Sequence, residues 1–124
     1  MFPSFDELAP LFQFMLNHGS VSVFMTNLCA NTDCIIPTIP RLHCDSASVH
    51  VNHMDVLTDC CGITDNGTTR IKHVTLKTSY CTFRIDYVKQ RAILKTRSIG
   101  LIDTYRRLTN QVGLPLHVVM PPQN

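Results

Sequence analysis

The chain has 124 residues, 44% of them hydrophobic and 16% charged, with a formal net charge of +2. We expect one domain over residues 1–124, and this length excludes a TIM barrel or a complete two-halved dinucleotide-binding fold. An all-helical bundle is excluded as well, because good helix formers are scarce, with one Glu and four Ala, and β-branched residues are abundant, with thirteen Thr, ten Val and nine Ile.

The N-terminal segment predicts a helix. Ser4 and Glu7 have the spacing of a capping box, in which each side chain bonds the backbone amide of the other residue. Pro10 has no amide donor, but it is well tolerated at the first position of a helix. We therefore expect a short turn over residues 4–9 and an apolar helix over about 10–18.

Alternating hydrophobicity in the centre of the chain predicts antiparallel strands. The clearest case is 79–88, where Cys81, Phe83, Ile85 and Tyr87 share one face. Asn66-Gly67 is typical of a type I′ turn, so a hairpin is expected between strands that end near Asp65 and begin near Thr68. The expected strands are 20–28, 48–57, 70–78, 79–88, 89–97 and 116–120, with a loop over 31–41.

A second helix is expected over about 99–110. Ser98 can cap its N-terminus, and Leu101, Ile102, Tyr105 and Leu108 form one apolar stripe at helical spacing. The predicted fold class is α+β: a single domain with an antiparallel β-meander of about four to six strands, an N-terminal helix and a C-terminal helix.

Charge is divided unevenly along the chain. Residues 1–69 contain seven acidic residues and one basic residue, a net charge of −6. Residues 70–107 contain ten basic and two acidic residues, a net charge of +8, and residues 108–124 contain no charged side chain. Such asymmetry favours a polyanionic partner. The alternative is that the two halves face each other within the fold or across a homodimer.

The basic half suggests a binding surface. Within the expected strand 89–97 the cations occupy odd positions, which places them on one face. Tyr80, Phe83 and Tyr87 are near in sequence and could stack on unpaired bases, although such a stripe is more often core. We therefore expect a non-enzymatic protein that binds nucleic acid, RNA in particular, or an acidic protein surface. The candidate binding residues are Arg84, Lys89, Arg91, Lys95, Arg97, Arg106 and Arg107.

A cluster of cysteines and histidines raises the question of zinc. Cys29, Cys34, His50 and His53 have a spacing that a tetrahedral site permits. However, no CxxC pair occurs, and strand alternation would point the two histidines to opposite faces. We expect no cofactor and keep a zinc-stabilised module, with these four ligands, as an alternative.

Catalytic motifs are absent from the sequence, and because it contains a single Glu, a catalytic carboxylate pair would need aspartates. We therefore expect that the protein is not an enzyme. Abundant Cys, His and Thr with scarce Glu and Ala is similar to the composition of small virus-encoded accessory proteins. The second functional hypothesis is a self-associating regulator that uses its apolar N-terminal helix for protein–protein contacts.

The sequence shows neither a secretory signal nor an apolar stretch long enough to cross a membrane. We expect an intracellular protein, cytoplasmic or nuclear, with no membrane partner and with its six cysteines reduced. The alternative is a mature secreted chain, in which cysteines would pair and Asn66-Gly67-Thr68 would accept a glycan.

Overall fold

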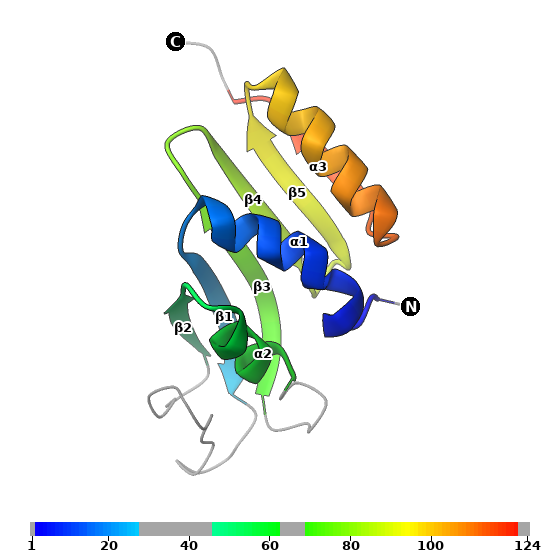
Figure 1. Ribbon diagram of the computed structural model, residues 1–124. Coiled ribbons are helices and arrows are strands. Elements are labelled where there is room, and N and C mark those ends of the chain that lie inside the picture. Colours follow the sequence, from blue (N-terminus) through cyan, green and yellow to red (C-terminus); the bar gives the residue numbers. More distant parts are fainter. Residues whose placement is uncertain (1, 28–45, 63–68, 122–124) are drawn as a thin grey trace.

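A computed structural model describes residues 2–27, 46–62 and 69–121 (Figure 1). The expected loop 31–41, the candidate ligands Cys29 and Cys34, and the Asn66-Gly67 pair lie outside the described residues. The described residues form three helices and one six-stranded sheet, which confirms the predicted α+β class. In chain order the elements are α1 (Phe5–His18), β1 (Val21–Asn27), β2 (Ser46–Val51), α2 (Met54–Gly62), β3 (Thr69–Lys77), β4 (Cys81–Asp86), β5 (Arg91–Thr96), α3 (Ile99–Gln111) and β6 (Leu116–Val119).

The sheet has the strand order β2-β1-β3-β4-β5-β6. All neighbouring strands are antiparallel except β5 and β6, which are parallel. The short connections 78–80 and 87–90 allow antiparallel hairpins, whereas the parallel pair needs a crossover, and α3 supplies it. The predicted edge strand near the C-terminus is confirmed as β6.

The three helices lie on one face of the sheet, as Figure 1 shows. Leu8, Leu11, Phe12 and Met15 of α1 are fully buried against this face. On β4 buried and half-buried residues alternate, so Phe83 enters the core while its neighbours point away from the helices. The core therefore lies between the sheet and the helices, and the opposite face of the sheet carries the remaining strand side chains.

Helix α1 is longer than the sequence predicted. It runs without interruption from Phe5 to His18 and includes Pro10, so the expected turn over 4–9 is wrong. The capping box between Ser4 and Glu7 is confirmed: Glu7 N donates to Ser4 Oγ (3.3 Å) and Ser4 N donates to Glu7 Oε1 (3.0 Å). Because this cap starts the helix early and four apolar residues are buried along it, the loss of one amide donor at Pro10 is tolerated.

The segment before β3 also differs from the prediction. The expected strand 48–57 stops at Val51, and α2 occupies residues 54–62. Met54, Leu57 and Cys60 are spaced by three residues, which is the spacing of one face of a helix. The segment therefore fits a helical period as well as the alternation that predicted a strand. In the described residues β3 begins at Thr69 and pairs with β1 and β4, and the expected hairpin at Asn66-Gly67 lies outside those residues.

Strands β4 and β5 are shorter than predicted because a turn separates them. Residues 87–90 form this turn, and Gln90 has φ 55°, which lies in the left-handed region. Asp86 Oδ1 accepts a hydrogen bond from Lys89 N (3.0 Å), which stabilises the turn. Lys89 therefore belongs to the turn. The pattern of cations at odd positions had placed it in the strand 89–97, and that placement is wrong.

Candidate functional site

The face of the sheet opposite the helices, here called the helix-free face, brings together side chains from all six strands. Strand register places these side chains in rows across the sheet, with the buried residues of each strand pointing the other way. Three rows cross β3, β4 and β5: Lys77–Thr82–Lys95, Thr75–Arg84–Ile93 and His73–Asp86–Arg91. The second row continues to Ser22 and His50 on one side and His117 on the other, and the third continues to Phe24 and Ser48.

The helix-free face is strongly basic. Among the described residues, Asp86 is its only acidic side chain. Adjacent strands lie about 4.8 Å apart and residues two apart on one strand about 6.7 Å, so the cations cover an area of roughly 10 by 13 Å. A surface of this kind attracts polyanions. Five basic residues whose side chains the structure describes lie on it: Lys72, Lys77, Arg84, Arg91 and Lys95.

An aromatic pair lies on the same face. Phe24 of β1 and His73 of β3 are opposite each other in register, and their rings stack with centroids 5.1 Å apart and planes 7° from parallel. Lys72 Nζ lies 5.5 Å from the centroid of the Phe24 ring. The register shifts beside Phe24, and this irregularity lets the adjacent Lys72 and His73 both approach the same ring.

The surroundings of His73 favour its neutral form. Partial burial, and next the positive charge of Arg84, lower the pKa of His73 below its usual value, while Asp86 opposes this and Lys72 adds to it. A hydrogen bond between His73 Nδ1 and Thr75 Oγ1 (3.1 Å) fixes the ring. The pair with Phe24 is thus an oriented aromatic platform beside the cations Lys72 and Arg84, with Asp86 opposite His73.

The single carboxylate does not neutralise this face. Asp86 already accepts from Lys89 N through one of its oxygens, which commits it to the β4–β5 turn. It lies directly opposite Arg91, whose Nε is buried and has no hydrogen-bond partner among the described residues. The cations of β3 and β5 in the Lys77–Thr82–Lys95 row are two rows away from this carboxylate.

The predicted binding residues are divided among four places. Arg84, Arg91 and Lys95 come together on the helix-free face. Lys89 lies in the β4–β5 turn, and Arg97 follows the end of β5. Arg106 and Arg107 are exposed on α3, in the helix layer, so they belong to a different surface.

The predicted aromatic partners are not on this face. Phe83 is fully buried and stacks on Tyr105 of α3 with ring centroids 4.1 Å apart. Tyr87 packs against Phe2, and burial raises its pKa far above the ordinary value. Tyr80 is exposed, but in the turn between β3 and β4.

Sequence reasoning missed Phe24, His73, Lys72 and Lys77. A signal for Phe24 was present, because it alternates with Val23 and Met25 and must point away from the core that they enter. The irregular register of β3 hides Lys72 and His73, since strict alternation would put them on opposite faces. Lys77 is found only through the pairing of β3 with β4.

Acidic residues of the first half lie on the other side of the molecule. Asp6 and Glu7 are on α1, and Asp55 and Asp59 are on α2. Among the described residues, therefore, the acidic half does not face the cations of the sheet. The described acidic residues of the first half therefore do not neutralise the basic face of the sheet, whereas the helix layer carries both these acids and the cations Arg106 and Arg107.

The alternative sites have less structural support. His50 lies on β2, where its Nδ1 and Ser22 Oγ are hydrogen-bonded (2.9 Å), and His53 is exposed just before α2. Residues 2–27, 46–62 and 69–121 contain no group of three His, Cys, Asp or Glu side chains that could hold a metal ion. The apolar side chains of α1 that self-association would use, such as Phe12, are buried in the chain's own core.

Three of the cysteines are described, and all are buried and not disulfide-bonded: Cys60, Cys61 and Cys81. Burial, with a smaller contribution from Asp59, raises the pKa of Cys60 to about 12. Burial also raises the pKa of Cys61. Thiols with raised pKa values are poor nucleophiles, so Cys60 and Cys61 act as core residues.

No helix in the described part of the chain is long and apolar enough to cross a bilayer. Comparison with protein-family models, curated proteins and solved structures found no match. The function must therefore be argued from the geometry of the helix-free face.

Proposed function

We propose that this protein binds single-stranded nucleic acid, RNA in particular, through its helix-free face. The observation that supports this proposal is the combination, among the described residues, of five cations and one carboxylate with the stacked Phe24–His73 pair on one face. Basic side chains neutralise phosphates, and aromatic rings stack on unpaired bases whatever their sequence. Binding should therefore tolerate many sequences.

The shape of the face favours a single strand over a duplex. The major groove of DNA admits a helix or a two-stranded ribbon, whereas six strands side by side are too wide to enter it. Stacking on Phe24 also requires a base whose faces are free. Single-stranded RNA provides both a flexible backbone and unstacked bases.

Salt dependence tests the proposal. If four phosphates are neutralised, the salt slope for a single strand is about −2.8, and affinity should fall roughly fiftyfold between 50 and 200 mM salt. The Lys72→Gln/Arg84→Gln variant should reduce the slope by about 1.4, so that the fall becomes roughly sevenfold. The measurement is fluorescence anisotropy with a labelled, unstructured oligoribonucleotide at several salt concentrations.

Arg106→Gln/Arg107→Gln is the matched control. It removes the same charge from exposed residues of α3, so the slope should remain that of the unmodified protein. If both double variants change the slope equally, binding is not confined to the helix-free face and the proposal fails. Poly-glutamate that competes as well as RNA would instead indicate an acidic protein partner.

An intracellular, reducing compartment is part of the same proposal. The described cysteines are buried and not disulfide-bonded, as expected where thiols stay reduced. Cytoplasm and nucleus both provide single-stranded RNA, so location in either is compatible with the proposed activity.

A further inference from the structure

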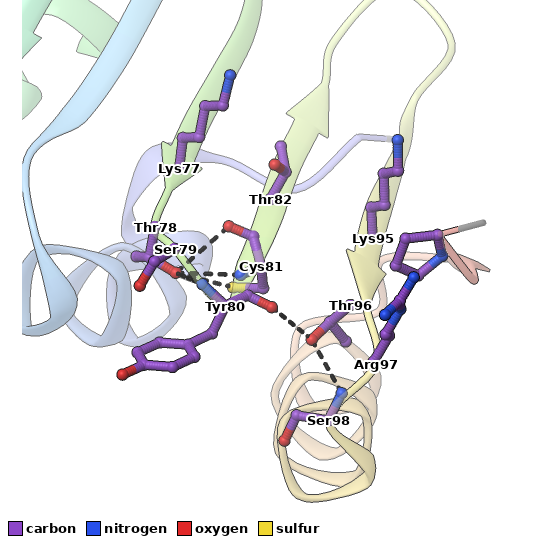
Figure 2. Close-up of a pocket in the computed structure, with 11 residues that line it drawn as sticks. Lys77, Thr78, Ser79, Tyr80, Cys81, Thr82, Lys95, Thr96, Arg97 and Ser98 are labelled. Atoms are coloured by element: carbon purple, nitrogen blue, oxygen red, sulfur yellow. Dashed lines mark hydrogen bonds between the residues drawn. The ribbon is translucent and has the colours of Figure 1, made fainter. Parts of the chain in front are cut away.

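One end of the helix-free face contains a cavity of about 700 Å³. It lies where the turn after β3 leads into β4 and where β5 leads into α3, and Figure 2 shows the side chains around it. The Lys77–Thr82–Lys95 row forms the part of the cavity that is continuous with the face. Its lining residues are Lys77, Thr78, Ser79, Tyr80, Cys81, Thr82, Lys95, Thr96, Arg97, Ser98 and Pro121.

Hydrogen bonds fix the walls of this cavity. Thr78 Oγ1 accepts from Cys81 N (3.1 Å) and from Tyr80 N (3.2 Å), which holds the β3–β4 turn in shape. Thr96 Oγ1 donates to Tyr80 O (2.9 Å) and accepts from Ser98 N (3.1 Å). Thr96 thereby links the turn to the connection between β5 and α3, so the two walls are positioned before any ligand binds.

Three basic residues line the cavity, and its lining among the described residues contains no carboxylate. Lys77 and Lys95 lie on either side of Thr82 in the same row, and Figure 2 shows their side chains extending in the same direction. Arg97 adds a third positive charge two residues beyond Lys95. Like charges about 10 Å apart across two strand spacings repel each other, and a bound anion relieves that repulsion.

We infer that this cavity binds the terminal phosphate of the bound strand, a phosphomonoester. The inference rests on the proposed function and adds a preference for strand ends. Two features favour an end over an internal phosphate. The sheet stops here, because β3 turns back and β5 gives way to α3, so a strand that follows the face has no further sheet to follow. A phosphomonoester also carries about −1.5 to −2 charges at pH 7, which suits three cations better than the single charge of a diester.

The test compares oligoribonucleotides of one sequence that differ only at their ends. One has a 5′-phosphate, one a 3′-phosphate and one hydroxyl groups at both ends, and each is measured by anisotropy at constant salt. A phosphorylated end should bind roughly fivefold more tightly than the hydroxyl-ended strand, the equivalent of about one exposed charge pair.

The cavity variant is Lys95→Gln/Arg97→Gln, and the matched control is Lys89→Gln/Arg106→Gln, which removes two exposed cations outside the cavity. The ratio of the two affinities, phosphorylated over hydroxyl-ended, should fall to about one in the cavity variant and stay unchanged in the control. Equal binding of all three oligonucleotides by the unmodified protein overturns the inference. A preference that survives in the cavity variant overturns it as well.

Free nucleotide tests whether the cavity binds a phosphomonoester that is not part of a strand. It also distinguishes the failure of the cavity inference from the failure of the proposed RNA binding. Uridine monophosphate that abolishes the end preference without displacing the strand supports the cavity as a phosphomonoester site. If no oligonucleotide binds at low salt, the proposed function fails. The amide NMR signals of residues 78–81 then decide the cavity alone: shifts with uridine monophosphate that are lost in the cavity variant support it, and their absence overturns it.

Discussion

Replacing Phe24 separates stacking from charge on the helix-free face. A base that stacks on the Phe24 ring takes the place of the Lys72 ammonium. Because Lys72 is exposed, its contact with the ring is worth about 0.5–1 kcal/mol. Stacking of one base is worth about 1–3 kcal/mol, so it displaces the ammonium, which is then free to contact a phosphate. The net loss for Phe24→Leu is about 1 kcal/mol, or roughly a fivefold weaker affinity for single-stranded RNA.

Phe24→Tyr is the matched control, because it keeps a ring that can stack on His73 and on a base. Phe24 is half-buried, and an apolar replacement at such a position costs less than about 1.5 kcal/mol of folding free energy, so both variants should fold. Anisotropy titrations give the affinities, and far-UV circular dichroism checks the fold. If Phe24→Leu binds as tightly as Phe24→Tyr, the aromatic platform plays no part and the reasoning is refuted.

Three further predictions concern the fold. Gln90→Gly should raise the free energy of unfolding in urea by about 0.5–1 kcal/mol, because glycine adopts the positive φ of this turn without strain; a lower value would contradict the turn geometry. Hydrogen bonds from Ser4 lower the pKa of Glu7, so the stability this carboxylate contributes is present above its unfolded pKa and is lost as the pH falls through its folded pKa. Glu7→Gln should remove that part of the pH dependence of thermal melting, and an unchanged acid limb would count against the capping box. Cys60 and Cys61 should resist a thiol reagent at pH 8 until the protein unfolds, as followed by peptide mass spectrometry; rapid labelling of the native protein would show that they are accessible.

Local patterns in the sequence were sufficient for much of the fold. Alternation identified β1, β3 and the centre of β4, and the Ser98 cap with its apolar stripe identified α3. These signals depend on residues close together in the chain, where side-chain spacing follows directly from the backbone period. The same reasoning failed in α2, where the sequence fits both the helical and the strand period. It also failed at the turn over 87–90, because the pattern of cations at odd positions continues through it.

The candidate site was only partly predictable. Arg84, Arg91 and Lys95 were found because each lies on a regular strand whose alternation is visible. Phe24 and His73 meet only because β1 pairs with β3, and single-strand patterns carry no information about such a long-range pairing.

The same limit explains the aromatic residues chosen from the sequence. Phe83 and Tyr87 are near the cations along the chain. However, they belong to the apolar stripe of residues 79–88, and this stripe packs in the core or against it because the helices cover that face of the sheet. The face that remains for binding is set by which side the helices occupy. That choice follows from the whole fold and not from the sequence around the cations.

The most direct test of the central claim is an NMR titration of the isotope-labelled protein with an unstructured oligoribonucleotide. The claim predicts that amide signals of β1, β3, β4 and β5 shift with RNA, with the largest changes near Phe24, His73 and Arg84, while the exposed residues of α3 remain unchanged. Shifts confined to the helices, or no shifts at low salt, would contradict it.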